Sequence, residues 1–233
     1  MLGAAVALSY AAFIDVGFLK AEGARALCER GADLRPAAAA VVEWLLGLKS
    51  NRVDCQVYLR AYWYDGAFDS THPTHHDQRR FFDAIAFTPG IQLRLGHVAE
   101  QQVRLENPIR QALRSTALGL GLDPQALLTE FDKHWTFYPE RQQKGVDTLI
   151  TLDLVRLAER HAYDTVILLA GDRDLAEAIR TAQAVGKRVI VATPSRDSLA
   201  KELAQLADEI IDLDEFTLHQ MLNPRKQRTS DQS

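Results

Sequence analysis

The sequence predicts an α/β fold in which a mainly parallel, doubly wound sheet is flanked by helices. Short apolar runs at 6–14, 165–170 and 188–192 are bounded by Asp, Gly or Pro, and the later two are rich in Val and Ile. Such runs are typical of buried parallel strands. Segments of helix length, with apolar residues at three- and four-residue spacing, lie between the later strands. This alternation indicates right-handed crossovers within one sheet.

The composition is that of a folded protein with one sizeable core. The chain has 233 residues, of which 47% are hydrophobic and 25% charged, so it is too apolar for intrinsic disorder. This length fits one large α/β domain with a modest insertion. Lys and Arg total 27 against 31 Asp and Glu, a net charge of −4. General electrostatic attraction to nucleic acid is therefore excluded, and any contact with a polyanion must be local.

We expect a single domain over residues 1–222 and a polar, disordered tail over 223–233. The remaining elements are expected as helices at 35–49, 78–86 and 216–222 and as strands at 54–64, 91–98 and 209–213. Residues 104–140 interrupt the alternation with Pro108, a Gly119/Gly121 pair and clustered aromatic residues. We interpret this segment as a mostly helical insertion. It is either a cap over the protein's own core or a partner surface in a homo-oligomer.

The first residues and the cysteines indicate where in the cell the protein is expected. The first 14 residues lack the basic region of a signal peptide, and their apolar run ends at Asp15. The run is shorter than the roughly 20 residues that span a bilayer, so we expect a buried strand and no contact with a membrane. Cys28 and Cys55 have neither zinc-binding spacing nor the density of a disulfide scaffold. A reducing cytoplasm is the expected location.

Three aspartates are expected at one edge of the sheet. Asp15 ends the first strand, and Asp172 and Asp174 follow the strand 166–170. Ligands of open α/β sheets bind beyond the carboxyl ends of the strands, where the strand order reverses. Carboxylates that converge there repel one another unless a cation neutralises them, which favours a divalent-metal site. Hard oxygen ligands select Mg²⁺ or Mn²⁺.

A further aspartate lies in the helix that leads into the second of these strands. Asp147 belongs to the first turn of that helix, and Asp153 follows six residues later. At about 100° per residue the two side chains point to different sides of the helix. Asp147 is therefore the better ligand, and Asp153 is a less certain metal ligand that could instead support the others or cap the helix. Since single aspartates are common at helix starts and strand ends, the joint placement carries the hypothesis.

The chain resembles a known family in several blocks that keep their order and spacing. The blocks are FIDVGFLK at 13–20, KGVDTLITLD at 144–153, VILLAGDRDLAEAI at 166–179 and GKRVIVATPSRDSLAKELAQLADEIIDL at 186–213. Together they are similar to the NYN domain of the PIN-like nuclease superfamily, LabA-like branch. The resemblance implies a PIN-like, Rossmann-like sheet with an acidic pocket that binds one or two Mg²⁺ or Mn²⁺ ions. It also implies metal-dependent hydrolysis of RNA phosphodiester bonds.

The resemblance also implies roles for particular residues. The catalytic and metal-binding positions would be Asp15, Asp147, Asp172 and Asp174, and Asp153 also matches a family position. Many NYN proteins have Gly and then Asn or an aromatic residue where this chain has Val16 and Phe18. Relatives often read Ser-Gly-Asp-Ser-Asp-Phe where this chain has AGDRDL at 170–175. The four aspartates are retained despite these departures. Candidate substrate contacts are Lys144, Phe18 and Arg173.

Other function classes stay open as alternatives. The leading one is a catalytically weak or inactive RNA-binding or regulatory module on the same fold, because Val16, Phe18 and Arg173 depart from the common motif. A haloacid-dehalogenase-type phosphatase is disfavoured, because the position two residues after Asp15 is Gly17 rather than a second Asp. No nucleotide cofactor is expected. The Gly119–Gly121 pair follows no strand, and Pro124 stands where a dinucleotide loop needs its third glycine.

A histidine-rich segment and an aromatic segment offer weaker signals. His72, His75 and His76 beside Asp77 have spacing that can bind zinc, but a surface loop explains them better. The aromatic residues at 62–64 are candidates for base stacking, with core packing favoured by their alternation.

Charged residues near these segments add two minor hypotheses. Asp65 is a further candidate outer ligand at the edge that carries Asp15. Arg79 and Arg80 belong to a broken basic track that either rims the pocket or lies on a solvated helix face.

Overall fold

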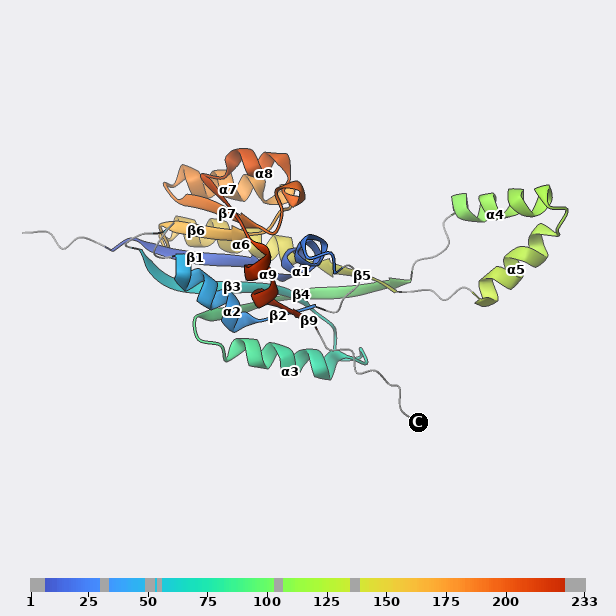
Figure 1. The fold of residues 1–233 in the computed structure, drawn as a ribbon, viewed down its shortest axis with the longest axis horizontal. Coiled ribbons are helices and arrows are strands. Elements are labelled where there is room, and N and C mark those ends of the chain that lie inside the picture. Colours follow the sequence, from blue (N-terminus) through green and yellow to red (C-terminus); the bar gives the residue numbers. More distant parts are fainter. Residues whose placement is uncertain are drawn as a thin grey trace, which may run out of the picture. The chain divides into compact units, whose positions relative to one another are not determined.

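The computed structural model describes residues 7–29, 34–48, 53, 56–102, 107–134 and 139–224. Its main feature is an open sheet with helices on both faces (Figure 1). The strands are β1 (Ser9–Asp15), β2 (Leu34–Pro36), β3 (Val57–Ala67), β4 (Ile91–Gln102), β5 (Pro139–Lys144), β6 (Thr165–Leu169), β7 (Arg188–Thr193), β8 (Glu209–Asp212) and β9 (Leu222–Pro224). The α-helices are α1 (Val16–Ala26), α2 (Ala38–Gly47), α3 (His75–Ala86), α4 (Asn107–Gly119), α5 (Pro124–His134), α6 (Val146–Glu159), α7 (Ala176–Ala184), α8 (Lys201–Leu206) and α9 (Glu215–Met221).

The order of the seven-stranded sheet is β5-β4-β3-β1-β6-β7-β8. The five neighbouring pairs from β4 to β8 are all parallel. From β1 the chain first builds outward through β3 and β4, and later builds outward on the other side through β6, β7 and β8. The strand order therefore reverses between β1 and β6, which is where open α/β sheets bind ligands. The predicted fold class is confirmed.

Two hydrophobic cores cover the two faces of this sheet, because successive side chains of a strand point to opposite sides. On one face, Tyr10 and Ile14 of β1 pack with Trp63 and with helices α1, α2, α3 and α9. On the other face, Phe13 of β1 packs with Tyr64 and with helices α6, α7 and α8. Strands buried on both faces explain why their sequences read as continuous apolar runs.

The strand register brings the carboxyl ends of the central strands level with one another. Ile14 of β1 pairs with Leu169, the last residue of β6. Asp15 pairs with Tyr64 of β3 on its other side. The residues that follow these strands therefore emerge at one edge of the sheet.

The apolar pattern of the sequence does not predict helix α1, which follows β1. Its buried residues are Val16, Leu19 and Gly23, a stripe that is narrow and ends in a residue without a side chain. A Cβ at Gly23 would collide with the side chain of Leu222, so the helix approaches β9 closely. The apolar pattern is weak because close backbone packing replaces side-chain burial here.

The predicted tail begins later than expected. Asn223 and Pro224 belong to β9, which pairs antiparallel with β2. The same small sheet shortens the helix expected at 35–49, because Arg35 and Pro36 are strand residues and α2 starts at Ala38. Residues 225–233 lie outside the described part of the chain.

Residues 98–142 form a separate compact unit that contains α4 and α5. Ala117 and Leu128 are buried, and Arg110 forms an ion pair of 3.1 Å with Asp132. The mostly helical insertion predicted at 104–140 is thus present as two helices. Much of the aromatic cluster noted there, at 135–138, lies outside the described residues. In the described part of the chain, no helix is long and apolar enough to span a bilayer.

Candidate metal centre

Asp15 connects β1 to α1. It is the last residue of the strand and the N-cap of the helix, and its Oδ1 accepts a hydrogen bond of 3.1 Å from the Phe18 amide. The side chain is almost completely buried, with 9% exposure. Burial raises the pKa of Asp15 to about 6, and the carboxylates of Asp147 and Asp65 add to this increase.

The loop after β6 carries two further carboxylates. Asp172 caps a short 3₁₀ turn, and its Oδ1 accepts a hydrogen bond of 3.0 Å from the amide of Asp174. Both aspartates are exposed. Gly171 precedes them where no side chain fits, because a Cβ there would overlap the ring of Phe18 and lie 2.8 Å from the carbonyl oxygen of Ser198. The absence of a side chain at Gly171 therefore lets this loop lie directly against α1.

Two glycines place the start of α6. Gly145, the N-cap, has φ +80°, a left-handed conformation that favours glycine. In β4, a Cβ at Gly96 would lie 2.8 Å from a methyl group of Val146 and 2.9 Å from the carbonyl oxygen of Lys144. The first turn of α6 can thus rest against β4, and this turn contains Asp147.

Asp147 links the other carboxylates electrostatically. Its own pKa is raised by burial and then by the negative charges of Asp172 and Asp174, and Asp147 in turn raises the pKa of Asp15. The structure therefore places Asp147 within electrostatic reach of Asp15 and of both aspartates of the loop after β6. None of the four forms an ion pair with a described residue.

The donor set of this centre fits a hard divalent cation. Carboxylate oxygens are the ligands that Mg²⁺ and Mn²⁺ prefer, and a cation would relieve the repulsion that raises these pKa values. Within the described ranges, no three His, Cys, Asp or Glu side chains are gathered closely enough to hold an ion as they stand.

Asp153, the fifth predicted ligand, lies in a different environment. Its Oδ2 accepts hydrogen bonds from the Tyr64 hydroxyl at 3.0 Å and from Arg94 Nε at 2.9 Å. The Arg94 guanidinium also lies 5.6 Å from the centre of the Tyr62 ring. Asp153 therefore ties α6 to β3 and β4. Its partners are 89 and 59 residues away in sequence, so no local pattern revealed them.

The structure adds one carboxylate that the sequence treated as a minor candidate. Asp65 directly follows Tyr64, the register partner of Asp15, and is only 8% exposed. Its Oδ1 accepts a hydrogen bond of 2.8 Å from the amide of Gly66. Because its charge also raises the pKa of Asp15, Asp65 belongs to the same electrostatic cluster.

The three predicted substrate contacts differ in their surroundings. Lys144 is exposed at the end of β5, three residues before Asp147. The ring of Phe18 fills the space above Gly171. Arg173 is exposed, and its Nε donates a hydrogen bond of 3.0 Å to Glu202 of α8.

The weaker sequence signals have local structural roles. Tyr62, Trp63 and Tyr64 are at most 7% exposed, so core packing is confirmed and base stacking there is wrong. His72 Nδ1 lies 2.8 Å from the Thr74 hydroxyl, and His75 Nδ1 lies 3.0 Å from the carbonyl oxygen of Phe68. In the described residues these imidazoles form no metal-binding group.

Comparison with known proteins decides the family. Residues 48–214 match the NYN domain family. This chain belongs to the NYN domain family. NYN domains are part of the PIN-like nuclease superfamily, as the motifs predicted. The matched residues include Asp147, Asp172 and Asp174, whereas Asp15 precedes them.

Individual relatives of this NYN protein support the fold more than the function. The chain is 41% identical over 86 residues to the uncharacterized protein y4oD of Sinorhizobium fredii, a match that covers 36% of this chain and 40% of that protein. The chain thus spans less than half of that relative. A crystal structure of VPA0982, a protein of unknown function from Vibrio parahaemolyticus, aligns with a TM-score of 0.50 and 16% identity. That alignment covers 95% of this chain and 99% of VPA0982, and it shows a shared fold.

Proposed function

We propose that this NYN-domain protein is a metal-dependent ribonuclease that hydrolyses RNA phosphodiester bonds. One observation carries the proposal: at the edge where the strand order reverses, burial and then neighbouring carboxylates raise the pKa of Asp15 and Asp147, and Asp172 and Asp174 are among those carboxylates. A fold gains no stability from uncompensated carboxylates, so such a cluster favours a functional site.

In this proposal the four aspartates hold Mg²⁺ or Mn²⁺. The bound cation supplies Lewis-acid stabilisation of the phosphate charge and lowers the pKa of water. Asp15 is the buried member, and Asp172 and Asp174 are the exposed members that meet the substrate side. Since the carboxylates repel a phosphodiester, a bound cation strengthens RNA binding at this edge.

The other candidate residues have supporting roles in this proposal. Lys144 is exposed near the start of α6, where its ammonium group can contact a substrate phosphate. Phe18 packs against Gly171 and thereby holds the loop of Asp172 against α1. Arg173 must exchange its contact with Glu202 to reach a substrate, which makes it the weaker phosphate ligand.

The test is cleavage of a pool of structured and single-stranded RNAs with Mn²⁺, Mg²⁺ or EDTA. Wild type is compared with Asp172→Asn and with Asp197→Asn, a matched loss of one exposed carboxylate from another short 3₁₀ turn. We expect cleavage that needs a divalent cation, that falls at least about 100-fold in Asp172→Asn and that persists in Asp197→Asn. Undiminished cleavage by Asp172→Asn would contradict the proposed centre.

A second candidate function is a non-catalytic RNA-binding module on the same fold. It is favoured by the departures from the common motif at Val16, Phe18 and Arg173, the last of which forms an ion pair with Glu202. In the same experiment, RNA that stays bound and uncut by the wild type with either cation would support this module over the nuclease.

A further inference from the structure

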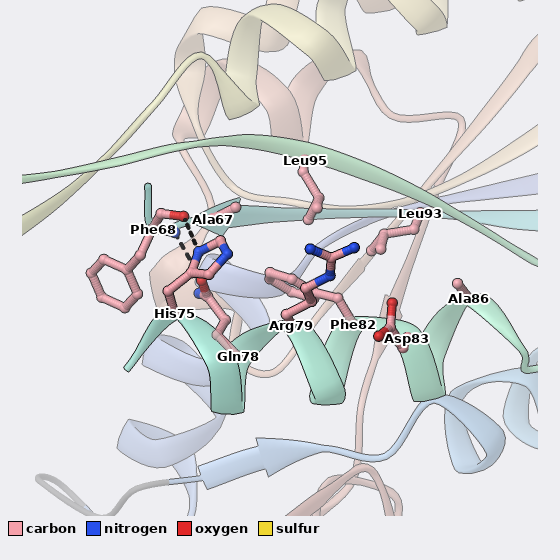
Figure 2. A pocket seen from close by; sticks show the side chains of 10 residues that line it. All are labelled: Ala67, Phe68, His75, Gln78, Arg79, Phe82, Asp83, Ala86, Leu93 and Leu95. Carbon is pink, nitrogen blue, oxygen red and sulfur yellow. Dashed lines mark hydrogen bonds between the residues drawn. The ribbon is translucent and has the colours of Figure 1, made fainter. Parts of the chain in front are cut away.

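A cavity of about 270 Å³ lies between α3 and the strands β3 and β4 (Figure 2). Leu93 and Leu95 of β4 and Phe82 of α3 provide apolar walls. Polar side chains of the same helix, His75, Arg79 and Asp83, also line it. Apolar walls with a few convergent polar groups are typical of ligand sites, and this volume is at the small end of their range.

This cavity lies at the sheet edge that carries the aspartates. Ala67, which lines it, is two residues beyond Asp65 on β3, or about 7 Å along an extended strand. Gln78 fastens α3 to this strand end, because its amide nitrogen donates to the Gly66 carbonyl at 2.9 Å and its oxygen accepts from the Phe68 amide at 2.8 Å. A strand of nucleic acid that passes Asp65 can therefore continue along this end of β3 to the cavity.

Hydrogen bonding defines the chemistry that His75 presents. Its Nδ1 lies 3.0 Å from the carbonyl oxygen of Phe68. A carbonyl oxygen only accepts, so Nδ1 carries the proton of this bond. In the neutral imidazole, Nε2 is then an acceptor.

Arg79 and Asp83 supply complementary polar groups. They lie four residues apart on α3, so both face the same side of the helix. Neither side chain forms an ion pair or a hydrogen bond with another residue of the described ranges. Their side chains extend from the helix toward the strands in Figure 2. The cavity thus offers guanidinium donors and carboxylate acceptors to one small ligand.

We propose that this cavity is a subsite for one unstacked base of the RNA strand, an inference that rests on the proposed function. Single-stranded RNA presents unstacked bases whose edges carry both donors and acceptors. Arg79 donates to the acceptors of the base edge, and Asp83 or His75, each about one turn of α3 from Arg79, accepts from its donors. A phosphate group does not fit this cavity, because Asp83 repels its negative charge and the apolar walls offer it no hydrogen bonds.

The test measures the binding of short RNAs in EDTA at low salt, so that metal-dependent cleavage does not occur. An eight-nucleotide single-stranded RNA with bases is compared with an eight-residue abasic RNA by fluorescence anisotropy. Arg79→Ala is paired with Arg80→Ala, which removes the same charge from an adjacent residue that does not line the cavity. Ala86→Leu fills the cavity without a change of charge and retains a strong helix former.

We expect Arg79→Ala and Ala86→Leu to bind the base-bearing RNA about tenfold more weakly than wild type. Arg80→Ala should change binding of the two RNAs equally, and binding of abasic RNA should not distinguish Arg79→Ala from Arg80→Ala. The subsite is wrong if Arg79→Ala and Ala86→Leu bind base-bearing RNA as Arg80→Ala does, or if wild type does not prefer RNA with bases. If the expected pattern appears but wild type never cuts RNA with Mn²⁺, the subsite stands and the proposed nuclease fails.

Discussion

Two aspartates of helix α6 lie in opposite electrostatic surroundings. Asp147, in the first turn, has a pKa that is raised by burial and then by the neighbouring carboxylates of Asp172 and Asp174. Asp153, in the middle of the helix, accepts hydrogen bonds from Arg94 and Tyr64. One carboxylate therefore carries uncompensated charge, whereas the other is neutralised by the protein itself.

This difference separates a candidate ligand from a structural residue better than sequence position does. Both aspartates belong to the same motif, KGVDTLITLD, and both were candidate ligands. A carboxylate that already has a cationic partner has less to offer a metal ion, and its removal leaves that partner unpaired. A carboxylate among other carboxylates is repelled by their charges, and a metal ion removes this repulsion. Neutralising such a carboxylate by mutation should therefore stabilise the folded protein. Substitutions at the two kinds of site should therefore have opposite effects on stability.

The largest loss of stability should come from Asp153→Ala. Without Asp153, the half-buried Arg94 guanidinium and the buried Tyr64 hydroxyl lose their shared acceptor. We expect the free energy of unfolding to fall by about 2–3 kcal/mol, measured by urea denaturation.

The control for this prediction is the double variant Arg94→Ala/Asp153→Ala. If the pair interacts as described, the double variant loses less stability than the sum of the two single variants. Full additivity, or an Asp153→Ala protein as stable as wild type, would show that this ion pair does not stabilise the fold.

Asp15→Asn should have an effect of similar size in the opposite direction. Its folded-state pKa of about 6 exceeds the ordinary value of 3.8, so ionisation of Asp15 disfavours the folded state at neutral pH. Asn keeps a side-chain oxygen for the Phe18 amide. We expect the metal-free variant to be more stable than wild type by about 3 kcal/mol at pH 7.

The pH dependence supplies the control for Asp15→Asn. The gain in the free energy of unfolding of Asp15→Asn over wild type should be complete above pH 6 and should shrink as the pH falls. It should vanish below about pH 4, where Asp15 of the wild type is protonated in both the folded and the unfolded state. Denaturation series across this range measure it. An advantage that does not change with pH would mean that ionisation of Asp15 is not its cause.

The sequence was sufficient for the central strands. The strands β6 and β7 are buried on both faces, so their apolar runs are visible without neighbours. Asp15 ends β1 and Asp172 lies three residues after the end of β6, so the rule for carboxyl ends of parallel strands predicts both at one edge of the sheet. Their role as metal ligands stays a prediction.

Features that depend on distant contacts escaped prediction. Helix α1 buries a glycine against β9, which no apolar periodicity reveals. The structural role of Asp153 depends on Tyr64 and Arg94, which come from two other strands. The cavity beside α3 likewise exists only once Leu93 and Leu95 of β4 face that helix.

The most direct test of the central claim is calorimetric titration of Mn²⁺ into wild type and Asp147→Asn at pH 7.5. Glu159→Gln, an exposed carboxylate at the other end of α6, is the matched control. If the clustered aspartates hold the cation, wild type and Glu159→Gln bind Mn²⁺ equally, whereas Asp147→Asn binds it at least about tenfold more weakly. Equal affinity of all three proteins for Mn²⁺, or no binding by wild type, would contradict a metal centre at this edge of the sheet.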